Sequence, residues 1–417
     1  MNKFNKFAAA AAAFALAATV SSCGAPEAIT FGNSTKTALT VDGYDVPAGV
    51  FIYNEIYAYS SAAYELYSKN GEYPKFEDVK NATIESMDST DWIQDKATEA
   101  CRDFVANERE FAKIGESFTD EELTQIKQII DSNANNTTFT ENGIGSDSMR
   151  AVIENTYKQD HIFKHYYGLD KEKGCSEEEL KEYYLDKTAR IKYFAISLLD
   201  ENGEKLGADE LRRVNKMADE YVKEINDEST NLKKLWKIDE CEKNYNDYVT
   251  ERSEKAAAEA GVTTVAVTTT VTTTADSNAT TTTTTTDPYA NEVTITKRTT
   301  TKADDTEIAI TTTTSVESGK SAQAATDYND YVFEKLGLYK AEKYQYDENT
   351  VYIIIKGDLE ERMKDDDLWS EDNINNLISE RYYEDFQNMM KDIANGYTVD
   401  KNASAYRRYS PFKLSIE

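Results

Sequence analysis

The pattern of apolar and polar residues from Thr188 to Asp227 predicts one strand, a turn and one amphipathic helix. In the strand, apolar side chains point to both sides: Ile191, Tyr193 and Ala195 to one, and Phe194, Ile196 and Leu198 to the other. This pattern is typical of a strand that is covered on both faces. Asn202-Gly203 predicts the turn. The helix that follows has one apolar stripe, formed by Leu211, Val214, Ala218, Tyr221, Val222 and Ile225.

Helical spacing also dominates the chain before this strand. A first apolar stripe follows Pro47 and consists of Ile52, Ile56, Tyr59, Ala63 and Leu66. A second helix is expected from about Asp91 to Ile114, with Gly115 ending it. Thr119 and Ser176 each have Glu three positions later, which predicts capping boxes at the starts of two more helices. The polar run 131–142 predicts a loop, and a long helix is expected from Ser146.

The last part of the chain predicts a return to regular structure. Residues 332–338 predict a short helix, and residues 346–357 predict a hairpin arm with its turn at 347–349. Another helix is expected after Ser370. The whole pattern predicts an α+β fold that is mainly helical.

Residues 250–326 differ in composition from the rest of the chain. They contain unbroken threonine runs at 280–286 and 311–314 and almost no aromatic residues. Such a segment buries too little apolar surface to offset the entropy of ordering the chain. We interpret it as a disordered Thr-rich insert, of the kind that carries O-linked glycans in Thr-rich stalks. Its Val-Thr-Thr stretches have β propensity, so local strand pairing is the alternative.

The N-terminal residues have the features of an export signal. Lys3 and Lys6 precede an Ala-rich apolar segment that is shorter than a typical membrane span. Ser21, Ser22 and Cys23 then place small residues before a cysteine, as in a lipobox. We expect lipidation of the Cys23 thiol, which would anchor the protein to the extracytoplasmic face of the cell membrane. The alternative is an ordinary signal peptide with a coincidental cysteine.

Charge and cysteine content narrow the class of protein. The formal net charge of −29 argues against nucleic acid and anionic membrane surfaces as direct partners. It favours solubility and, as a second interpretation, basic binding partners. Beyond Cys23 the chain has Cys101, Cys175 and Cys241, an odd number without CxxC spacing, so no disulfide framework is predicted.

The sequence offers few candidates for catalysis or metal binding. Its two histidines, His161 and His165, are four residues apart and share a helix face. A two-histidine metal site is one interpretation, and a pair of surface or boundary histidines is the other. The residues between them lack the Glu of a zincin motif. There is no phosphate-binding glycine loop or nucleophile elbow, so no metal, cofactor or catalytic residue is predicted.

The order of the predicted elements resembles that of a known family. A strand near Thr40, a Val-Asp-Gly turn, long helices, an acidic capping box and SEEELKEYY at 176–184 precede the strand at 188–198. In this order the chain resembles the SurA- and PrsA-type foldases. These combine a helical chaperone lobe with a parvulin-type peptidyl-prolyl isomerase domain. The resemblance covers roughly residues 38–226 and resumes near the C-terminus. It implies that the C-terminal tail packs beside the strand near Thr40.

The resemblance implies a division of the chain into seven parts. These are a lipoprotein signal peptide at 1–22, a tether at 23–36, a helical chaperone lobe at 37–187, the first half of a parvulin-like domain at 188–249, the Thr-rich insert at 250–326, the second half of that domain at 327–360, and a C-terminal helix and strand at 361–417 that return to the chaperone lobe.

The family's catalytic histidines have no counterpart in this chain. Phe194-Ala195-Ile196 occupies the first strand of the parvulin-like part, and residues 350–353, Thr-Val-Tyr-Ile, occupy its last strand. The resemblance therefore implies that isomerase activity is lost. Weak activity supported by Tyr193, Ser197 or Tyr352 is the alternative.

Tyrosine is frequent, with 28 residues, several of them in adjacent pairs. Core packing is one interpretation of these rings. The other is a cleft that holds unfolded segments through apolar contacts and single hydroxyl hydrogen bonds. The candidate client-binding residues are Tyr183, Tyr184, Tyr193, Phe194 and Tyr352.

The sequence and the resemblance together imply a membrane-anchored extracytoplasmic chaperone. Its partners would be unfolded or newly exported polypeptides, held without ATP, and the membrane, contacted through the lipid anchor. Two alternatives stay open: a surface-display or adhesion lipoprotein with a glycosylated Thr-rich segment, and an active peptidyl-prolyl isomerase. The sequence specifies no oligomeric state.

Overall fold

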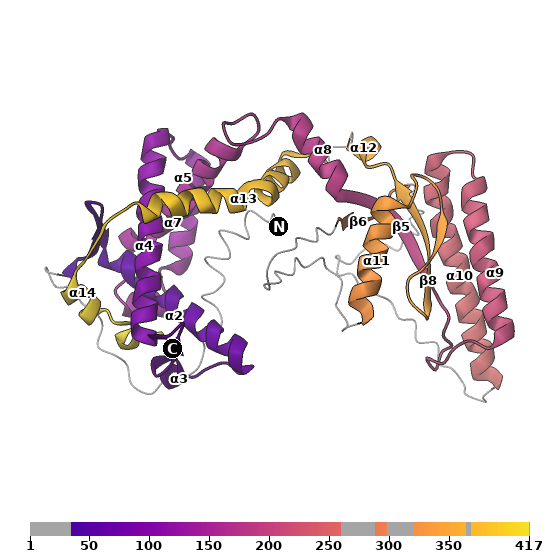
Figure 1. The fold of residues 1–417 in the computed structure, drawn as a ribbon, viewed down its shortest axis with the longest axis horizontal. Helices are drawn as coiled ribbons and strands as arrows, with labels where there is room; N and C mark the ends of the chain where they lie inside the picture. The colour runs from indigo at the N-terminus through magenta and orange to yellow at the C-terminus, as the bar shows by residue number, and fades with distance from the viewer. Residues whose placement is uncertain (1–34, 260–287, 298–319, 364–367, 417) are drawn as a thin grey trace. The chain divides into compact units, whose positions relative to one another are not determined.

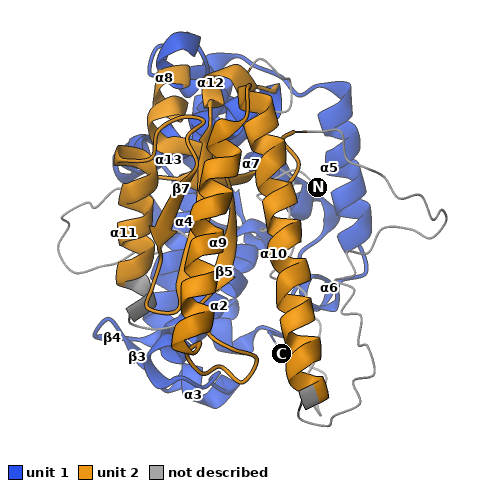
Figure 2. Cartoon of the chain, turned by 90° about the vertical axis from the view of Figure 1, so that its right-hand side faces the viewer, with its two compact units in different colours: residues 1–180, 371–417 blue, residues 181–370 orange. Residues whose placement is uncertain are grey.

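The structure is a computed structural model of the chain that describes residues 35–259, 288–297, 320–363 and 368–416. Over these residues it is an α+β fold, about 63% helical with small antiparallel sheets, as the sequence predicts. The expected signal segment and Cys23 lie outside the described residues. Residues 1–180 and 371–417 form one unit, and residues 181–370 form a second (Figure 2). We call them unit 1 and unit 2.

Unit 1 is mainly helical (Figure 1). Its helices are α2 (Ala48–Asn70), α3 (Phe76–Lys80), α4 (Ser89–Ile114), α5 (Asp120–Asn133), α6 (Thr137–Glu141), α7 (Ser146–Tyr167), α13 (Glu371–Asn395) and α14 (Ala403–Arg408), with a 3₁₀ helix at Pro411–Lys413. The apolar stripe of α2 faces the core, where Ile52 is fully buried and Ile56 nearly so. Cys101 and Phe104 of α4 pack into the same core.

The first described strands and a strand near the C-terminus form a small sheet of unit 1. Strands β1 (Thr37–Val41), β2 (Tyr44–Pro47) and β9 (Val399–Lys401) are antiparallel in the order β2-β1-β9. Thr40 pairs with Asp400, so the C-terminal tail lies beside the strand near Thr40, as the resemblance to the foldases implies. Gly43, at the β1–β2 turn, has a φ of 82°, which glycine adopts without steric cost. A short hairpin of β3 (Thr83–Ile84) and β4 (Met87–Asp88) precedes α4.

The predicted helix boundaries in this region are confirmed by their caps. Gly115 follows α4 in the left-handed conformation, with a φ of 71°. Before α5, the Thr119 hydroxyl accepts a hydrogen bond from the Glu122 N–H, and the Glu122 carboxylate accepts one from the Thr119 N–H. Ser176 and Glu179 form the same reciprocal pair at the start of α8 (Glu177–Lys187).

Unit 2 is built on an antiparallel sheet with the strand order β6-β5-β8-β7. The strands are β5 (Thr188–Ser197), β6 (Val293–Thr296), β7 (Glu342–Gln345) and β8 (Thr350–Gly357). Its helices are α9 (Ala208–Asp227), α10 (Asn231–Glu259), α11 (Lys320–Glu334) and the short α12 (Leu359–Arg362). The β7–β8 hairpin is the arm that the sequence predicts at 346–357, with its first strand placed slightly earlier.

Helices cover both faces of this sheet (Figure 1). Helices α9 and α10 pack on the face that carries Phe194 and Ile196. Helix α11 packs on the opposite face, against Ile191 and Ile354. Strand β5 is therefore covered on both faces, as its two-sided apolar pattern predicts. The predicted stripe of α9 is also confirmed, since Val214, Ala218, Tyr221 and Ile225 are buried.

The prediction that residues 250–326 form one segment without regular structure is wrong in three places. Residues 250–259 continue α10, residues 293–296 form β6, and α11 begins at Lys320. Tertiary contacts explain this: β6 gains backbone partners on β5, and Val332 of α11 is fully buried against the sheet. The remaining parts of the predicted insert, 260–287 and 298–319, lie outside the described residues.

Two smaller predictions are also wrong. The loop expected at 131–142 contains the end of α5 and all of α6, because Phe139 is buried in the core of unit 1. The helix expected at 332–338 ends at Glu334 and starts much earlier, at Lys320.

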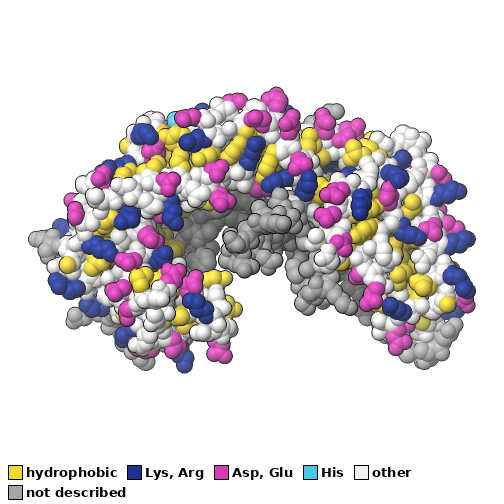
Figure 3. All heavy atoms as spheres, in the orientation of Figure 1, with side chains coloured by type: hydrophobic (Ala, Val, Ile, Leu, Met, Phe, Trp, Pro, Cys, Tyr) yellow, Lys and Arg dark blue, Asp and Glu magenta, His cyan; other side chains and the backbone are white. Residues whose placement is uncertain are grey.

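The surface mixes both signs of charge. On the face that Figure 3 draws, acidic and basic side chains are interspersed over the described residues. None of the helices in the described ranges combines the length and the apolar character that a bilayer crossing requires.

One buried carboxyl group in unit 1 generates a prediction about stability. Glu55 of α2 is fully buried. Burial raises the pKa of Glu55 well above its usual range. The folded chain therefore binds a proton that the unfolded chain has released, so stability falls as the pH rises above about 4.5.

We expect Glu55→Gln to raise the free energy of unfolding by about 1–2 kcal/mol at pH 7.5 and to change it little at pH 4. Urea unfolding at the two pH values measures this. Glu72→Gln, at an exposed position after the same helix, is the control and should have no such pH-dependent effect. Equal effects of Glu55→Gln at both pH values would contradict the buried-acid explanation.

Candidate functional site

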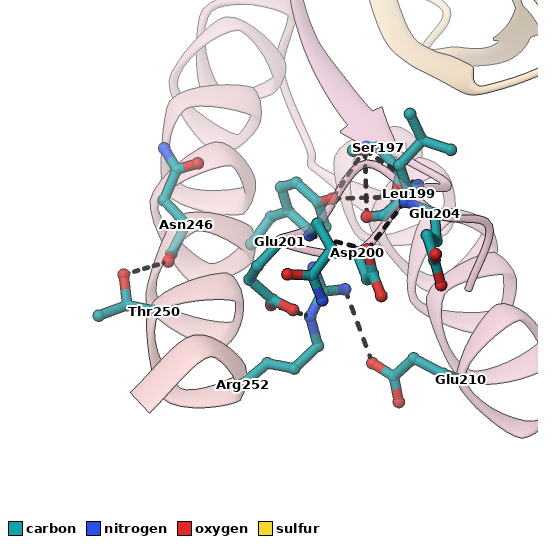
Figure 4. Close-up of polar contacts among 11 residues, drawn as sticks. Ser197, Leu199, Asp200, Glu201, Glu204, Glu210, Asn246, Thr250 and Arg252 are labelled. Carbon is teal, nitrogen blue, oxygen red and sulfur yellow. Dashed lines mark hydrogen bonds and ion pairs between the residues drawn. The ribbon is translucent and has the colours of Figure 1, made fainter. Parts of the chain in front are cut away.

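The candidate binding site is a pocket in unit 2, at the end of β5 (Figure 4). It has a volume of about 360 Å³. Its apolar side is formed by Ala195, Leu199, Tyr245 and Val249. Its polar side is formed by Ser197, Asp200, Glu201, Asn246, Arg252 and Thr350. These residues come from β5, the loop that follows it, α10 and the start of β8; we call the site the β5 pocket.

One hydrogen bond joins the strand to the helix inside this pocket. The Ser197 N–H donates to the Tyr245 hydroxyl of α10 at 2.9 Å. The Tyr245 ring also packs near Phe194, with a centroid distance of 6.2 Å. The next residue, Leu198, donates its N–H to Asn349 beside β8, at 2.7 Å. The Ser197 N–H therefore points away from β8, toward the pocket.

Asp200 fixes the loop at the rim of the pocket. Its carboxylate accepts hydrogen bonds from the N–H groups of Glu204 and Asn202, at 2.9 and 2.8 Å. These two bonds lower the pKa of Asp200, so the group is ionised at neutral pH. The loop consequently holds a fixed negative charge at the pocket entrance.

Arg252 is the cation of the pocket, and its side chain is 17% exposed. Its Nε donates to Glu201 at 2.8 Å, and its Nη1 lies 3.9 Å from Glu210 of α9. The hydrogen bond from Arg252 lowers the pKa of Glu201. With Asp200, three carboxylates surround a single guanidinium, so this part of the pocket has a net negative charge.

The candidate client-binding residues lie in three separate places of unit 2. Tyr193 and Tyr352 are neighbours on the α11 face of the sheet, with ring centroids 4.9 Å apart. Phe194 is 4% exposed and packs under α9 and α10, so it is a core residue and is not available to a client. Tyr183 and Tyr184 lie on α8, where the Tyr183 hydroxyl accepts a hydrogen bond from Lys187 and the Tyr184 ring contacts Trp369.

Tyr193 and Tyr352 belong to a larger cluster of rings. Its members are Tyr193, Tyr328, Tyr331, Tyr344, Tyr346 and Tyr352, from β5, α11, the β7–β8 hairpin and β8. Tyr328 lies at its centre, and its hydroxyl is buried without a hydrogen bond among the described residues. Burial raises the pKa of Tyr328 above its usual range. The contacts within this cluster are those of a packed core between α11 and the sheet.

A second group of tyrosines lies on the surface of unit 1. Tyr64, Tyr67 and Tyr73 are 63%, 42% and 70% exposed. Their rings form a chain of contacts, with centroid distances of 6.2 Å between Tyr64 and Tyr67 and 6.3 Å between Tyr67 and Tyr73. Gly71 has a φ of 75° and ends α2, which turns the chain so that Tyr73 follows the last helical rings. We call these three residues the tyrosine row.

The two histidines lie against acidic residues of unit 1. His161 contacts Glu116 at 2.6 Å and Glu122 at 2.8 Å, and His165 contacts Glu116 at 3.2 Å. Burial lowers the pKa of His161, but the hydrogen bonds to Glu116 and Glu122 outweigh it and raise the pKa overall. Among the described residues, no group of His, Cys, Asp and Glu is placed to hold a metal ion. The arrangement is an ionic contact between α7 and the start of α5.

The cysteines offer no nucleophile in the described ranges. Cys101, Cys175 and Cys241 are buried and form no disulfide there. Burial raises the pKa of Cys101 and of Cys241 to about 12, so these thiols are not ionised at neutral pH. Cys101 is a core residue, as the sequence predicts.

Sequence reasoning missed the β5 pocket because α10 was not recognised. A signal was available: Leu235, Ile238, Cys241, Tyr245 and Val249 repeat at helical spacing and continue toward Arg252. The Thr-rich composition that starts further along the chain led us to end the ordered region too early.

Comparison of this chain with protein-family models, with curated proteins and with solved structures finds no match. The likeness to SurA- and PrsA-type foldases therefore stays a prediction from the sequence.

The His161 contacts generate a prediction about pH. Because the pKa of His161 is raised, its contribution to stability is complete below about 6.5 and is lost as the pH rises through the higher folded value. We expect Glu116→Gln and Glu122→Gln each to lower the pKa of His161, measured from its ring signals by NMR. Glu121→Gln, exposed on the same helix, is the control. An unchanged titration in both variants would show that these carboxylates do not hold the imidazolium.

Proposed function

We propose that this protein is a membrane-anchored extracytoplasmic chaperone that holds exported polypeptides without ATP. The proposal joins the lipobox at Cys23, the likeness to SurA- and PrsA-type foldases and the contact surfaces of the two units. The anchor and the location rest on the sequence alone. The newly exported, unfolded polypeptides are its clients.

The tyrosine row is the observation that supports client binding best. Three adjacent rings that are largely exposed present apolar faces and polar hydroxyls to the same partner. Such rings bind varied unfolded segments because they combine apolar area with a single adaptable hydrogen bond each. The sequence contains no phosphate-binding glycine loop, which favours holding that is independent of nucleotide.

We propose that the protein holds its clients and does not catalyse isomerisation of their X-Pro bonds. The family's first-strand histidine is replaced by Phe194-Ala195-Ile196, and Phe194 is buried. Of the three residues that the alternative names, Tyr193 and Tyr352 lie within the packed tyrosine cluster, and only Ser197 lies in the β5 pocket. Rotation about an X-Pro bond has a barrier of about 18–20 kcal/mol, and lowering it requires groups that reach the reacting peptide bond.

A surface-display or adhesion lipoprotein is the second candidate, and the Thr-rich composition of residues 262–286 and 298–314 favours it. In that case the Thr-rich segments would carry the function, and the folded units would only support them.

Replacing Tyr64, Tyr67 and Tyr73 together by Ser should weaken client binding at least about tenfold, because each ring contributes roughly 1 kcal/mol of contact. The measurement is suppression of aggregation of a chemically unfolded client by the chain without its first 23 residues. The matched control replaces the same residues by Phe, which keeps the rings and should keep the activity. A version with residues 262–286 replaced by a short Gly-Ser linker should remain active, whereas loss of activity would favour the display function.

A protease-coupled proline assay tests the loss of isomerase activity. We expect a proline-containing tetrapeptide to isomerise at its uncatalysed rate in the presence of the protein, because the histidines of the parvulin site are absent. A parvulin assayed in parallel is the positive control. Acceleration that Tyr352→Phe removes would instead assign an active isomerase site to β8.

A further inference from the structure

Within the described ranges, part of strand β5 has a paired strand on one side only. Strand β8 pairs with β5 from Arg190 to Ser197. On the other side, β6 pairs with β5 only from Thr188 to Ile191. Among the described residues, the stretch from Lys192 to Ile196 therefore has an open edge of the sheet along the side that β6 begins to cover, and the Tyr245 hydroxyl ends this edge at Ser197.

The backbone groups at this edge can be assigned from the pairing. In an antiparallel strand, the N–H and C=O groups of alternate residues point to opposite sides. The Lys187 carbonyl accepts a hydrogen bond from the Lys297 N–H at the end of β6, and the Ser197 N–H, ten residues on, points to Tyr245 on the same side. Tyr193 and Ala195 share this alternation, so their N–H and C=O groups face the open edge. Ala195 is exposed, which leaves this edge accessible.

The chain's own β6 cannot extend along this edge. Asn291 has a φ of 65°, and the Glu292 N–H donates to the Tyr289 carbonyl in a turn just before β6. The turn directs the chain toward α10, where Pro288 accepts a hydrogen bond from the Lys192 ammonium group. Among the described residues, the edge beyond Ile191 therefore has no paired strand.

The open edge and the β5 pocket are one continuous surface. Ala195 and Ser197 belong to both, since they line the pocket and lie on the edge. A strand added beside Tyr193 and Ala195 would therefore place one of its side chains in the pocket. The pocket offers an apolar wall of Leu199, Tyr245 and Val249 and a carboxylate rim.

We propose that an extended segment of a client polypeptide adds to β5 as an edge strand and places a Lys or Arg side chain in the β5 pocket. The backbone of the segment exchanges hydrogen bonds with Tyr193 and Ala195, which requires no particular sequence. The aliphatic stem of the basic residue packs on the apolar wall, and its charge lies at Asp200 and Glu201. This inference rests on the proposed chaperone function and names the class of segment that unit 2 selects.

The charges around the β5 pocket favour a basic side chain over an acidic one. Asp200, Glu201 and Glu210 outnumber Arg252, which is already paired with two of them. An acidic side chain would approach the two rim carboxylates and be repelled. The net charge of −29 for the whole chain also attracts basic segments and repels acidic ones at longer range.

The test uses the chain without its first 23 residues and labelled seven-residue peptides with the sequence Thr-Val-Thr-Xaa-Thr-Val-Thr. Fluorescence anisotropy should show about fivefold tighter binding for Xaa = Lys than for norleucine, and weaker binding for Glu. Glu201→Gln should reduce the preference for Lys and leave the norleucine peptide unchanged. Equal binding of the Lys and Glu peptides would overturn the basic-pocket part of the proposal.

The strand pairing is tested without altering the protein. N-methylation of alternate residues on one side of the Lys peptide should abolish binding, and N-methylation on the other side should not, because only one side pairs with β5. Bound peptide should also slow hydrogen exchange at the amides of Tyr193 and Ala195. Equal binding of the two methylated peptides, or unprotected amides, overturns strand addition.

Ala195→Pro gives a complementary variant. The Ala195 N–H faces away from β8, so proline blocks the edge without removing a β5–β8 hydrogen bond. We expect peptide binding to fall at least about tenfold, while Ala195→Val, which keeps the N–H, retains it. Circular dichroism melting of both variants checks that they fold. A dimer that Ala195→Pro dissociates, combined with no peptide binding, would assign the edge to a second copy of this chain and overturn the proposal.

The experiments distinguish failure of the strand-addition proposal from failure of the chaperone proposal. If the tyrosine row suppresses aggregation while no peptide adds to β5, the chaperone proposal stands and this inference is wrong. If neither the peptides nor the unfolded client bind, both are wrong.

Discussion

The arrangement of unit 2 depends on one buried ammonium group. The Lys192 side chain is 2% exposed, in the middle of β5. It donates to the Asp239 carboxylate at 2.5 Å and to the backbone carbonyls of Leu235 and Pro288 at 2.8 and 3.4 Å. A buried charge is tolerated only when partners replace the water it loses, and removing one partner costs about 3–5 kcal/mol. Lys192 therefore fixes α10 and the residues before β6 against the same strand.

A second buried charge, on Glu292, fixes the residues at the start of β6. The Glu292 side chain is 1% exposed and contacts Arg190 of β5 at 3.1 Å and Arg362 of α12 at 3.3 Å. It lies one residue before β6, so it fixes where that strand starts. Because β6 starts there and the preceding turn faces α10, β5 keeps an open edge beyond Ile191. The two buried ion pairs thus determine the surface from which we infer strand addition.

The two proposed contact surfaces use different chemistry. The tyrosine row offers side-chain rings, which bind unfolded segments without a fixed register. The edge of β5 offers backbone groups, which hold a segment in a fixed register, and the adjacent pocket selects the side chain that enters it. In the proposed chaperone, each unit would therefore contribute a distinct kind of contact to the client.

Local patterns in the sequence determined much of this structure. The two-sided strand at β5, the stripes of α2 and α9, the caps at Gly115 and Thr119 and the mainly helical α+β class follow from residue spacing and from backbone preferences. Such features depend on neighbours within a few positions, so a single sequence reveals them. The place of the C-terminal tail beside Thr40 was also predicted, although from resemblance to a family and not from spacing.

Only the tertiary structure decided the features on which the candidate sites depend. Strand β6 and the end of α10 occur in or beside Thr-rich sequence that has little tendency to fold alone. Strand β6 pairs with the backbone of β5 beside the Glu292–Arg190 contact, and Arg252 near the end of α10 pairs with Glu201, so both elements have partners distant in the chain. Phe194 became a core residue and Ala195 an exposed edge residue for the same reason. The spacing of apolar residues indicates which face of the sheet a side chain lies on. Which edge stays unpaired depends on where distant segments end, and that is set by their contacts in the folded chain.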